Sequence, residues 1–119
     1  MTATNGTTGY VYCMSNECIP GLVKVGFTFN DPSTRAKELY TTGVPMPFKV
    51  EFAKKVLDPE DKERKLHALL TKHFSRPNGQ REFFRCMPSD AKEFFDLLDG
   101  PYQMTSLQQD LAKFLFKGL

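Results

Sequence analysis

The segments Gly9–Met14 (GYVYCM) and Leu22–Phe27 (LVKVGF) decide the fold of this chain. Each is a short apolar run with β-branched or aromatic residues, and residues 15–21 between them include Asn, Pro and Gly, which interrupt strands and form turns. The pattern predicts two antiparallel strands joined by a turn. Because strand side chains alternate between faces, we expect Tyr12 and Lys24 on the same face of this hairpin, with a phenol beside an ammonium.

Two helices are expected downstream, each beginning at an Asp-Pro pair. At 31–32 and at 58–59 the aspartate can cap free backbone N–H groups, while the proline takes the first helical position, where no donor is needed. The first helix would carry Arg35 at the edge of its buried stripe, and the second would run to about Phe74. Both helices are expected to cover the hairpin.

Between these helices, Phe48, Val50 and Phe52 alternate with Lys49 and Glu51. Alternation of apolar and polar residues is typical of a strand with one buried face. The segment therefore predicts a third strand whose apolar side chains all point the same way.

Two further helices are expected near the C-terminus. Ser89 can cap the first, and Gly100 and Pro101 end it. The last begins at Thr105 or Ser106 and has an apolar stripe that we expect to close the domain's own core, with pairing to a partner or a second copy (a homodimer) as the alternative. That stripe consists of Leu107, Leu111, Phe114 and Leu115.

The expected fold class is α+β, a small, mainly antiparallel β-sheet with three central strands flanked by about four helices. At 119 residues the chain has the size of one ordinary domain. We place that domain at residues 9–119, after a flexible leader at residues 1–8, which have little apolar surface to bury.

Charge and cysteine content narrow the function classes. The formal net charge of +2 permits nucleic acid as a partner, but any basic footprint has to be local. The three cysteines and two histidines lack metal-ligand spacing, which favours a reduced protein with neither disulfides nor a zinc site. No apolar run approaches a membrane span and no signal-peptide core begins the chain, so we expect an intracellular protein, in the cytoplasm or nucleus.

The hairpin residues Tyr10–Tyr12 and Lys24–Gly26 resemble the two halves of the GIY-YIG nuclease signature, with Lys in place of the second signature tyrosine. The resemblance is close to the phage- and virus-associated branch of that superfamily and covers about residues 9–86, which leaves the two C-terminal helices outside. It implies a GIY-YIG-like fold and metal-dependent hydrolysis of DNA phosphodiester bonds. The later motifs that follow in the expected order are Arg35, Glu63, Leu66-His67 and Arg81-Glu82-Phe83-Phe84.

The resemblance implies that Tyr12 takes a proton from the attacking water or helps to hold it. A free phenol has a pKa of about 10 and is a poor base at neutral pH, so it needs a positive neighbour. Lys24 is the expected neighbour. Because Lys24 also departs from the family's named motif, the identity of the general base stays open.

The other functional positions also come from the resemblance. Arg35 would hold the scissile phosphate through two parallel hydrogen bonds, and Glu82 would bind Mg²⁺ (or Mn²⁺) together with phosphate oxygens and waters. His67, with its ring oriented by Glu63 one turn earlier, would shuttle a proton or bind the phosphate. Gly26 would let the substrate backbone approach the strand.

DNA is the expected partner, with Lys24, Arg35 and Arg81 as candidate contacts. The remaining basic residues are scattered, so contacts to the DNA backbone are expected before any reading of bases. Each candidate alone also has an ordinary structural explanation, such as a surface ion pair between Arg35 and Glu38. The alternative function is a non-catalytic DNA-binding or accessory module that keeps the GIY-YIG fold.

Overall fold

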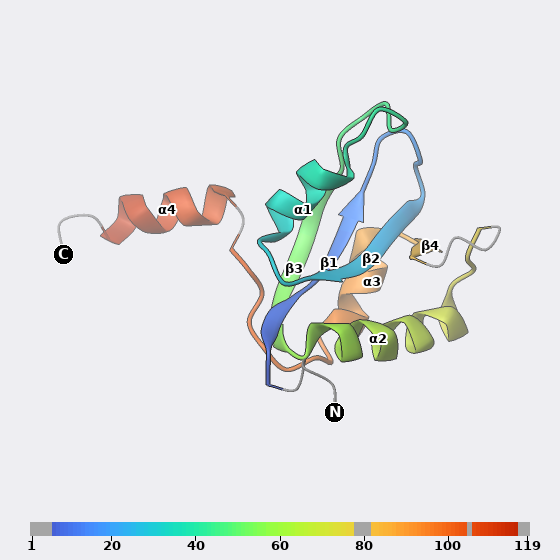
Figure 1. Cartoon of the computed structure of the whole chain (residues 1–119). Helices are drawn as coiled ribbons and strands as arrows, with labels where there is room; N and C mark the ends of the chain where they lie inside the picture. Colours follow the sequence, from blue (N-terminus) through green and yellow to red (C-terminus); the bar gives the residue numbers. More distant parts are fainter. Residues whose placement is uncertain (1–5, 78–81, 105, 117–119) are drawn as a thin grey trace.

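The structure is a computed structural model that describes residues 6–77, 82–104 and 106–116. It contains a four-stranded antiparallel sheet and four helices, which confirms the α+β class (Figure 1). The elements in chain order are β1 (Thr8–Ser15), β2 (Leu22–Thr28), α1 (Pro32–Leu39), β3 (Lys49–Leu57), α2 (Pro59–His73), β4 (Phe83–Arg85), α3 (Pro88–Phe95) and α4 (Ser106–Phe116).

The predicted hairpin forms the centre of the sheet, whose strand order is β3-β1-β2-β4. Tyr12 pairs with Gly26 and Met14 pairs with Lys24 across β1 and β2. Cross-strand partners share a face, so the prediction that Tyr12 and Lys24 lie on one face is confirmed. The short β4 pairs with the Leu22–Lys24 end of β2.

Each face of the sheet is covered by different helices (Figure 1). On one face, Val11 and Val25 pack in a core with residues of α2 and α3, such as Leu70 and Phe95. On the other face, Tyr12 packs in a smaller cluster with residues of α1 and β3. The alternation of Tyr12 with Val11 and Cys13 along β1 therefore decides which helix each side chain meets.

The third strand differs from its prediction because β1 and β3 shift register between Cys13 and Met14. Cys13 pairs with Phe52 and Met14 pairs with Val50, so the intervening position on β3 is skipped. A bulge of this kind reverses the faces beyond it. Phe52 consequently packs against the larger core, whereas Val50 packs in the smaller cluster, and the prediction of one shared buried face is wrong.

The two Asp-Pro pairs begin helices, but only the first does so as predicted. The Asp31 carboxylate accepts a hydrogen bond from the Ser33 N–H at 3.0 Å, as an N-cap. Asp58 has a left-handed backbone (φ 51°) and makes no side-chain cap; its carboxylate instead accepts the Gly6 N–H at 2.8 Å. Asp58 therefore ties the segment before β1 to the start of α2. Of the expected leader, residues 1–5 lie outside the described residues, and Thr8 already belongs to β1.

The third helix begins one residue before its predicted cap. Pro88 is its first residue, and the Asp90 carboxylate accepts the backbone N–H of Met87 at 3.0 Å. Ser89 is thus inside the helix, and the prediction that it caps the helix is wrong. The Asp90 carboxylate, in the first turn, therefore satisfies the Met87 N–H at the start of the helix.

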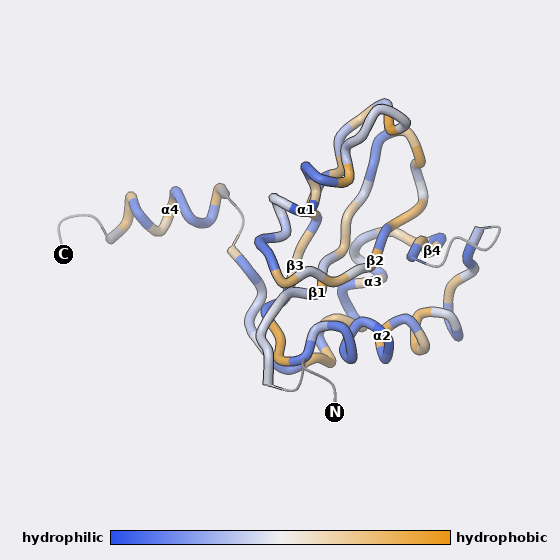
Figure 2. Tube along the Cα trace, viewed as in Figure 1, coloured by the Kyte–Doolittle hydropathy of each residue, from blue (hydrophilic) through white to orange (hydrophobic). Residues whose placement is uncertain are grey.

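The last helix does not close the core. Leu107 and Phe114 are 77% and 71% exposed, and Leu111 and Leu115 are also exposed. Figure 1 shows α4 projecting from the body, and Figure 2 shows hydrophobic and hydrophilic positions alternating along it. The prediction that this stripe completes the core is wrong, and Thr105, its alternative first residue, lies outside the described residues. None of the helices in the described part of the chain is long and apolar enough to cross a membrane.

Candidate active site

The phenol of Tyr12 is held in a gap that only glycine leaves open. Tyr12 is 1% exposed, and a Cβ built on its cross-strand partner Gly26 would lie 2.5 Å from the Tyr12 hydroxyl oxygen. Gly26 is therefore needed to make room for the ring, rather than only for an approaching substrate. From α1, Arg35 shares a hydrogen bond with the hydroxyl and also pairs with Glu38 at 3.3 Å.

Burial raises the pKa of Tyr12 above its usual range. The hydrogen bond from Arg35 opposes this shift, and the negative charges of Glu82 and Glu63 add to it. The resting phenol is therefore protonated at neutral pH. The cation that lowers this pKa is Arg35, whereas Lys24, expected from the sequence to assist Tyr12, is paired with Glu82.

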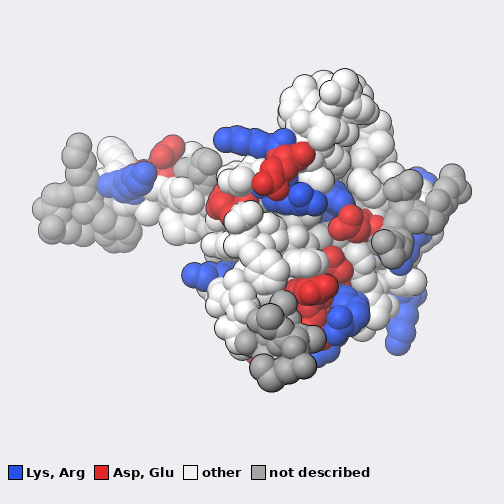
Figure 3. Space-filling view, viewed as in Figure 1, with Lys and Arg blue, Asp and Glu red and all other residues white. Residues whose placement is uncertain are grey.

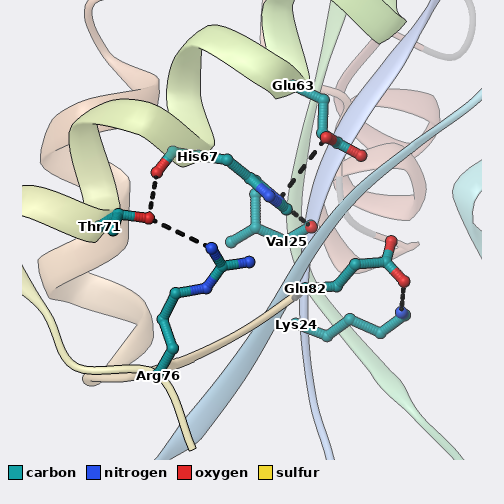
Figure 4. Close-up of polar contacts among 7 residues, drawn as sticks. All are labelled: Lys24, Val25, Glu63, His67, Thr71, Arg76 and Glu82. Carbon is teal, nitrogen blue, oxygen red and sulfur yellow. Dashed lines mark hydrogen bonds and ion pairs between the residues drawn. The ribbon is translucent and has the colours of Figure 1, made fainter. Parts of the chain in front are cut away.

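Lys24 instead forms an ion pair with Glu82. The Lys24 ammonium lies 2.8 Å from the Glu82 carboxylate and 5.3 Å from the centre of the Phe83 ring (Figure 4). The Lys24 side chain is buried, while that of Glu82 is 46% exposed. Pairing of β2 with β4 brings the two together, because Glu82 directly precedes β4 and its backbone C=O accepts the Val25 N–H at 2.8 Å. Glu82 is thus held from one side and accessible from the other.

His67 reaches from α2 to the backbone of β2. Its Nε2 lies 2.7 Å from the carbonyl oxygen of Val25, so the neutral ring donates Nε2–H to that oxygen (Figure 4). Burial lowers the pKa of His67, and the ring also packs edge-on against Phe84 with centroids 5.1 Å apart. The nearest Glu63 oxygen is 3.8 Å from Nε2, longer than a hydrogen bond. The Val25 carbonyl, rather than Glu63, therefore orients the ring.

Glu63 is a largely buried carboxyl whose charge is poorly compensated. Burial, followed by the negative charges of Glu82 and Glu60, raises the pKa of Glu63 to about 7, although Lys24 and Arg64 oppose the shift. The excess of negative charge around Glu82 suits a hard divalent cation with oxygen ligands. Within the described residues no group of three or more metal-ligating side chains occurs, so phosphate and water oxygens would have to supply the other ligands.

Several of the predicted site residues are linked through β2. Lys24 pairs with Glu82, the Glu82 backbone C=O accepts the Val25 N–H, and the Val25 carbonyl oxygen accepts a hydrogen bond from His67. The negative charges of Glu82 and Glu63 also add to the raised pKa of Tyr12. Among the candidates, Arg81 lies outside the described residues. Figure 3 shows basic and acidic side chains mixed over the face of the molecule in view, without a large patch of one sign.

Arg76 lies near the site, although from the sequence it was only one of the scattered basic residues. Arg76 lies beyond the C-terminal end of α2, and its guanidinium carbon is 4.8 Å from the centre of the Phe84 ring. Its positive charge contributes to the lowered pKa of His67. The sequence offered one signal for it, a cation shortly before Glu82 and on the other side of a turn.

Comparison with known proteins places this arrangement in a family. The model of a family described as the T5orf172 domain matches residues 9–99. The match includes α3, which lies outside the resemblance seen in the sequence motifs. No curated protein and no solved structure matches the chain. The T5orf172 domain is related to the GIY-YIG or homing-endonuclease-like fold and indicates a nuclease or DNA-binding type of domain. Because the match covers most of the chain, this protein belongs to the T5orf172 domain family.

Proposed function

We propose that this protein is a metal-dependent endonuclease that hydrolyses phosphodiester bonds of DNA. The observation that carries the proposal is the convergence of two pairs, Tyr12 with Arg35 and Lys24 with Glu82, beside one face of the central hairpin. A hydroxyl, a guanidinium and a half-exposed carboxylate together supply what phosphate chemistry requires. The family assignment supports this reading.

Arg35 and Tyr12 would act as a unit at the phosphate. The guanidinium is positioned to hold a phosphate oxygen while negative charge builds, and the phenol holds the attacking water through its hydroxyl. Because the resting phenol is protonated, Tyr12 would act as a base only after losing its own proton to solvent; the Arg35 hydrogen bond favours the resulting phenolate, although burial opposes it. Tyr12 is therefore the proposed base, with Arg35 in the assisting role first expected of Lys24.

Glu82 would hold the divalent cation, and Lys24 would fix Glu82 in place. A bound Mg²⁺ or Mn²⁺ would supply electrostatic stabilisation of the charge that develops on the phosphate. Lys24 is suited to positioning because its buried ammonium restrains one Glu82 oxygen at 2.8 Å. In this arrangement Lys24 sets the orientation of the carboxylate and offsets part of its charge.

His67 would be a positioning residue. The His67 Nε2–H donates to the Val25 carbonyl oxygen, and the Val25 N–H donates to the backbone carbonyl oxygen of Glu82. Val25 is thereby fixed from α2 on one side and from the segment before β4 on the other. This double attachment holds Lys24 and Gly26, the neighbours of Val25 along β2, at the site.

The test is incubation of the purified protein with plasmid and branched DNA, with Mg²⁺ and with a chelator. Cleavage that needs the metal and falls by roughly 100-fold or more in Arg35→Ala and Glu82→Ala would support the proposal. Arg64→Ala, which removes an exposed arginine paired with Asp61, is the matched control and should cut normally. Cutting that persists in chelator, or in Glu82→Ala, would refute the metal role.

A second candidate is a DNA-binding module that does not cut. Two observations favour it: the Tyr12 phenol is almost fully buried, and Glu82 is already paired with Lys24. Both could hold the site in an inactive form. DNA binding by the wild-type chain without cleavage on any substrate, with Mg²⁺ or Mn²⁺ present, would establish this alternative.

A further inference from the structure

We propose that Arg76 binds a phosphate group of the nucleic acid next to the candidate active site. The proposal rests on the proposed function, in that it takes DNA as the substrate. It assigns a second phosphate contact, on the α2 side of β4, in addition to the one expected of Arg35.

The Arg76 side chain is held in place by packing. Its guanidinium stacks over Phe84, with 4.8 Å between the guanidinium carbon and the ring centre, and Nη1 lies 3.4 Å from the Thr71 hydroxyl. The Thr71 hydroxyl in turn donates to the His67 carbonyl at 2.7 Å. A guanidinium fixed in this way loses little conformational entropy when it binds a ligand.

Among the residues that the structure describes, Arg76 has no negative partner. Lys24 is paired with Glu82, Arg35 with Glu38, and Arg64 with Asp61. In the described part of the chain no carboxylate lies within ion-pair distance of Arg76, and its Nε is buried without a hydrogen-bond partner. A partly desolvated cation without a counter-charge is costly, and a phosphate would supply the missing charge.

The position of Arg76 connects it to the site. Figure 4 shows its guanidinium pointing toward His67 and Val25, with Glu82 and Lys24 on the far side of the strand. Its charge is close enough to lower the pKa of His67. A DNA strand whose scissile phosphate lies at Arg35 and Glu82 would therefore carry a neighbouring phosphate toward Arg76.

A purely structural role is the competing explanation, because stacking on Phe84 alone would stabilise β4. The two explanations differ in what they predict for DNA. A structural arginine changes the unfolding midpoint and leaves the salt dependence of DNA binding unchanged. A phosphate-binding arginine changes the salt dependence.

The experiment measures binding of a labelled DNA duplex by fluorescence anisotropy across a range of salt concentrations, in chelator so that no cleavage occurs. Arg76→Gln should weaken binding by roughly fivefold to tenfold and reduce the slope of log K against log salt by about 0.9, the value for one lost phosphate contact. Arg76→Lys should keep the slope and bind with intermediate affinity, because the charge remains while the planar fork is lost.

Arg64→Gln is the control, since that arginine is exposed and already paired with Asp61, and it should change the affinity by less than about twofold. If Arg76→Gln binds like Arg64→Gln with an unchanged slope, while the wild type binds DNA, this inference fails and the proposed function stands. If the wild type binds no DNA, both fail. Thermal unfolding of each variant confirms that the compared proteins are folded.

Discussion

At the scale of single residues, the space around the Tyr12 phenol depends on the missing side chain at Gly26. The Cβ of an alanine there would lie 2.5 Å from the hydroxyl oxygen and 2.7 Å from Cζ of Tyr12. The ring is almost fully buried, so it has little freedom to move aside. Gly26 and Tyr12 therefore act as one packing unit.

Gly26→Ala should lower the free energy of unfolding by about 1–3 kcal/mol, as measured by urea denaturation, because of overpacking against Tyr12. Combining it with Tyr12→Phe, which removes the hydroxyl oxygen, should recover part of the loss. An equal loss in both backgrounds would show that the strain lies elsewhere.

Glu63 should make stability depend on pH. Its folded-state pKa of about 7 lies above the ordinary value of 4.5, so the folded protein holds this proton more tightly than the unfolded chain. Stability from this group is therefore greatest in acid and is lost as pH rises from about 4.5 to about 7.

Glu63→Gln should consequently raise the thermal midpoint by a few degrees at pH 8, and by less at pH 5, in a scan performed with chelator. Asp61→Asn, on the same helix and paired with Lys65, serves as the control because its pKa is lowered and not raised. A Gln effect that does not grow with pH would contradict the assigned cause.

For single residues, the face of a side chain could be predicted from the sequence, but its partners could not. The shared face of Tyr12 and Lys24 follows from strand alternation, which is local, and it was predictable. The partners of these two side chains depend on where α1 places Arg35 and where β4 places Glu82. Those positions are set by tertiary packing, so the pairing of Tyr12 with Lys24 was expected and the actual pairs were not.

At the scale of elements, α2 and β2 are joined by the hydrogen bond between His67 and the Val25 carbonyl. His67→Ala should remove it and lower the free energy of unfolding by about 1–2 kcal/mol. Gln can offer an amide N–H in place of Nε2–H, so His67→Gln should regain much of the stability and, if the protein is a nuclease, much of the cleavage rate.

Comparison of His67→Ala with His67→Gln distinguishes a positioning role of His67 from a role in proton transfer. A positioning role predicts that His67→Gln keeps the wild-type pH profile of cleavage. If His67→Gln regains stability yet cuts no faster than His67→Ala, the imidazole itself takes part in the chemistry.

The pairing of β1 with β3 explains why the prediction for β3 was partly wrong. Alternation in β3 is real, but the bulge opposite Cys13 and Met14 changes the face of Phe52 relative to Val50. A bulge depends on the partner strand and leaves no trace in the alternation of one segment. The existence of the strand was therefore predictable, and its orientation beyond the bulge was not.

At the scale of the whole molecule, α4 stands apart from the packed body. Its apolar side chains are mostly exposed, so they contribute little to the stability of the sheet and the other helices. The amphipathic pattern was correctly recognised in the sequence. What it packs against is not a local property, and the expectation that it would be the domain's own core was wrong.

A chain ended after Met104 should therefore unfold within about 2 °C of the full-length protein in a thermal scan, because few buried contacts are lost. Chemical denaturation should give the same m-value within its uncertainty. A fall of many degrees would show that α4 supports the body. Leu70→Ala, in the larger core, is the positive control and should destabilise strongly.

The short pairing of β4 with β2 affects how often Glu82 is in place beside Lys24. Among the described residues β4 pairs with β2 at three positions, and Glu82, which directly precedes it, adds one backbone hydrogen bond from the Val25 N–H. A strand end with so few ladder bonds opens locally at a lower free energy than the rest of a sheet, and hydrogen exchange reports such openings amide by amide. Fraying of the Glu82 end alone would carry Glu82 away from Lys24, while the buried Phe84 keeps the rest of β4 in the core. The assembled site would then be one of two interconverting states of an intact domain, and its population would vary with temperature well below the unfolding transition.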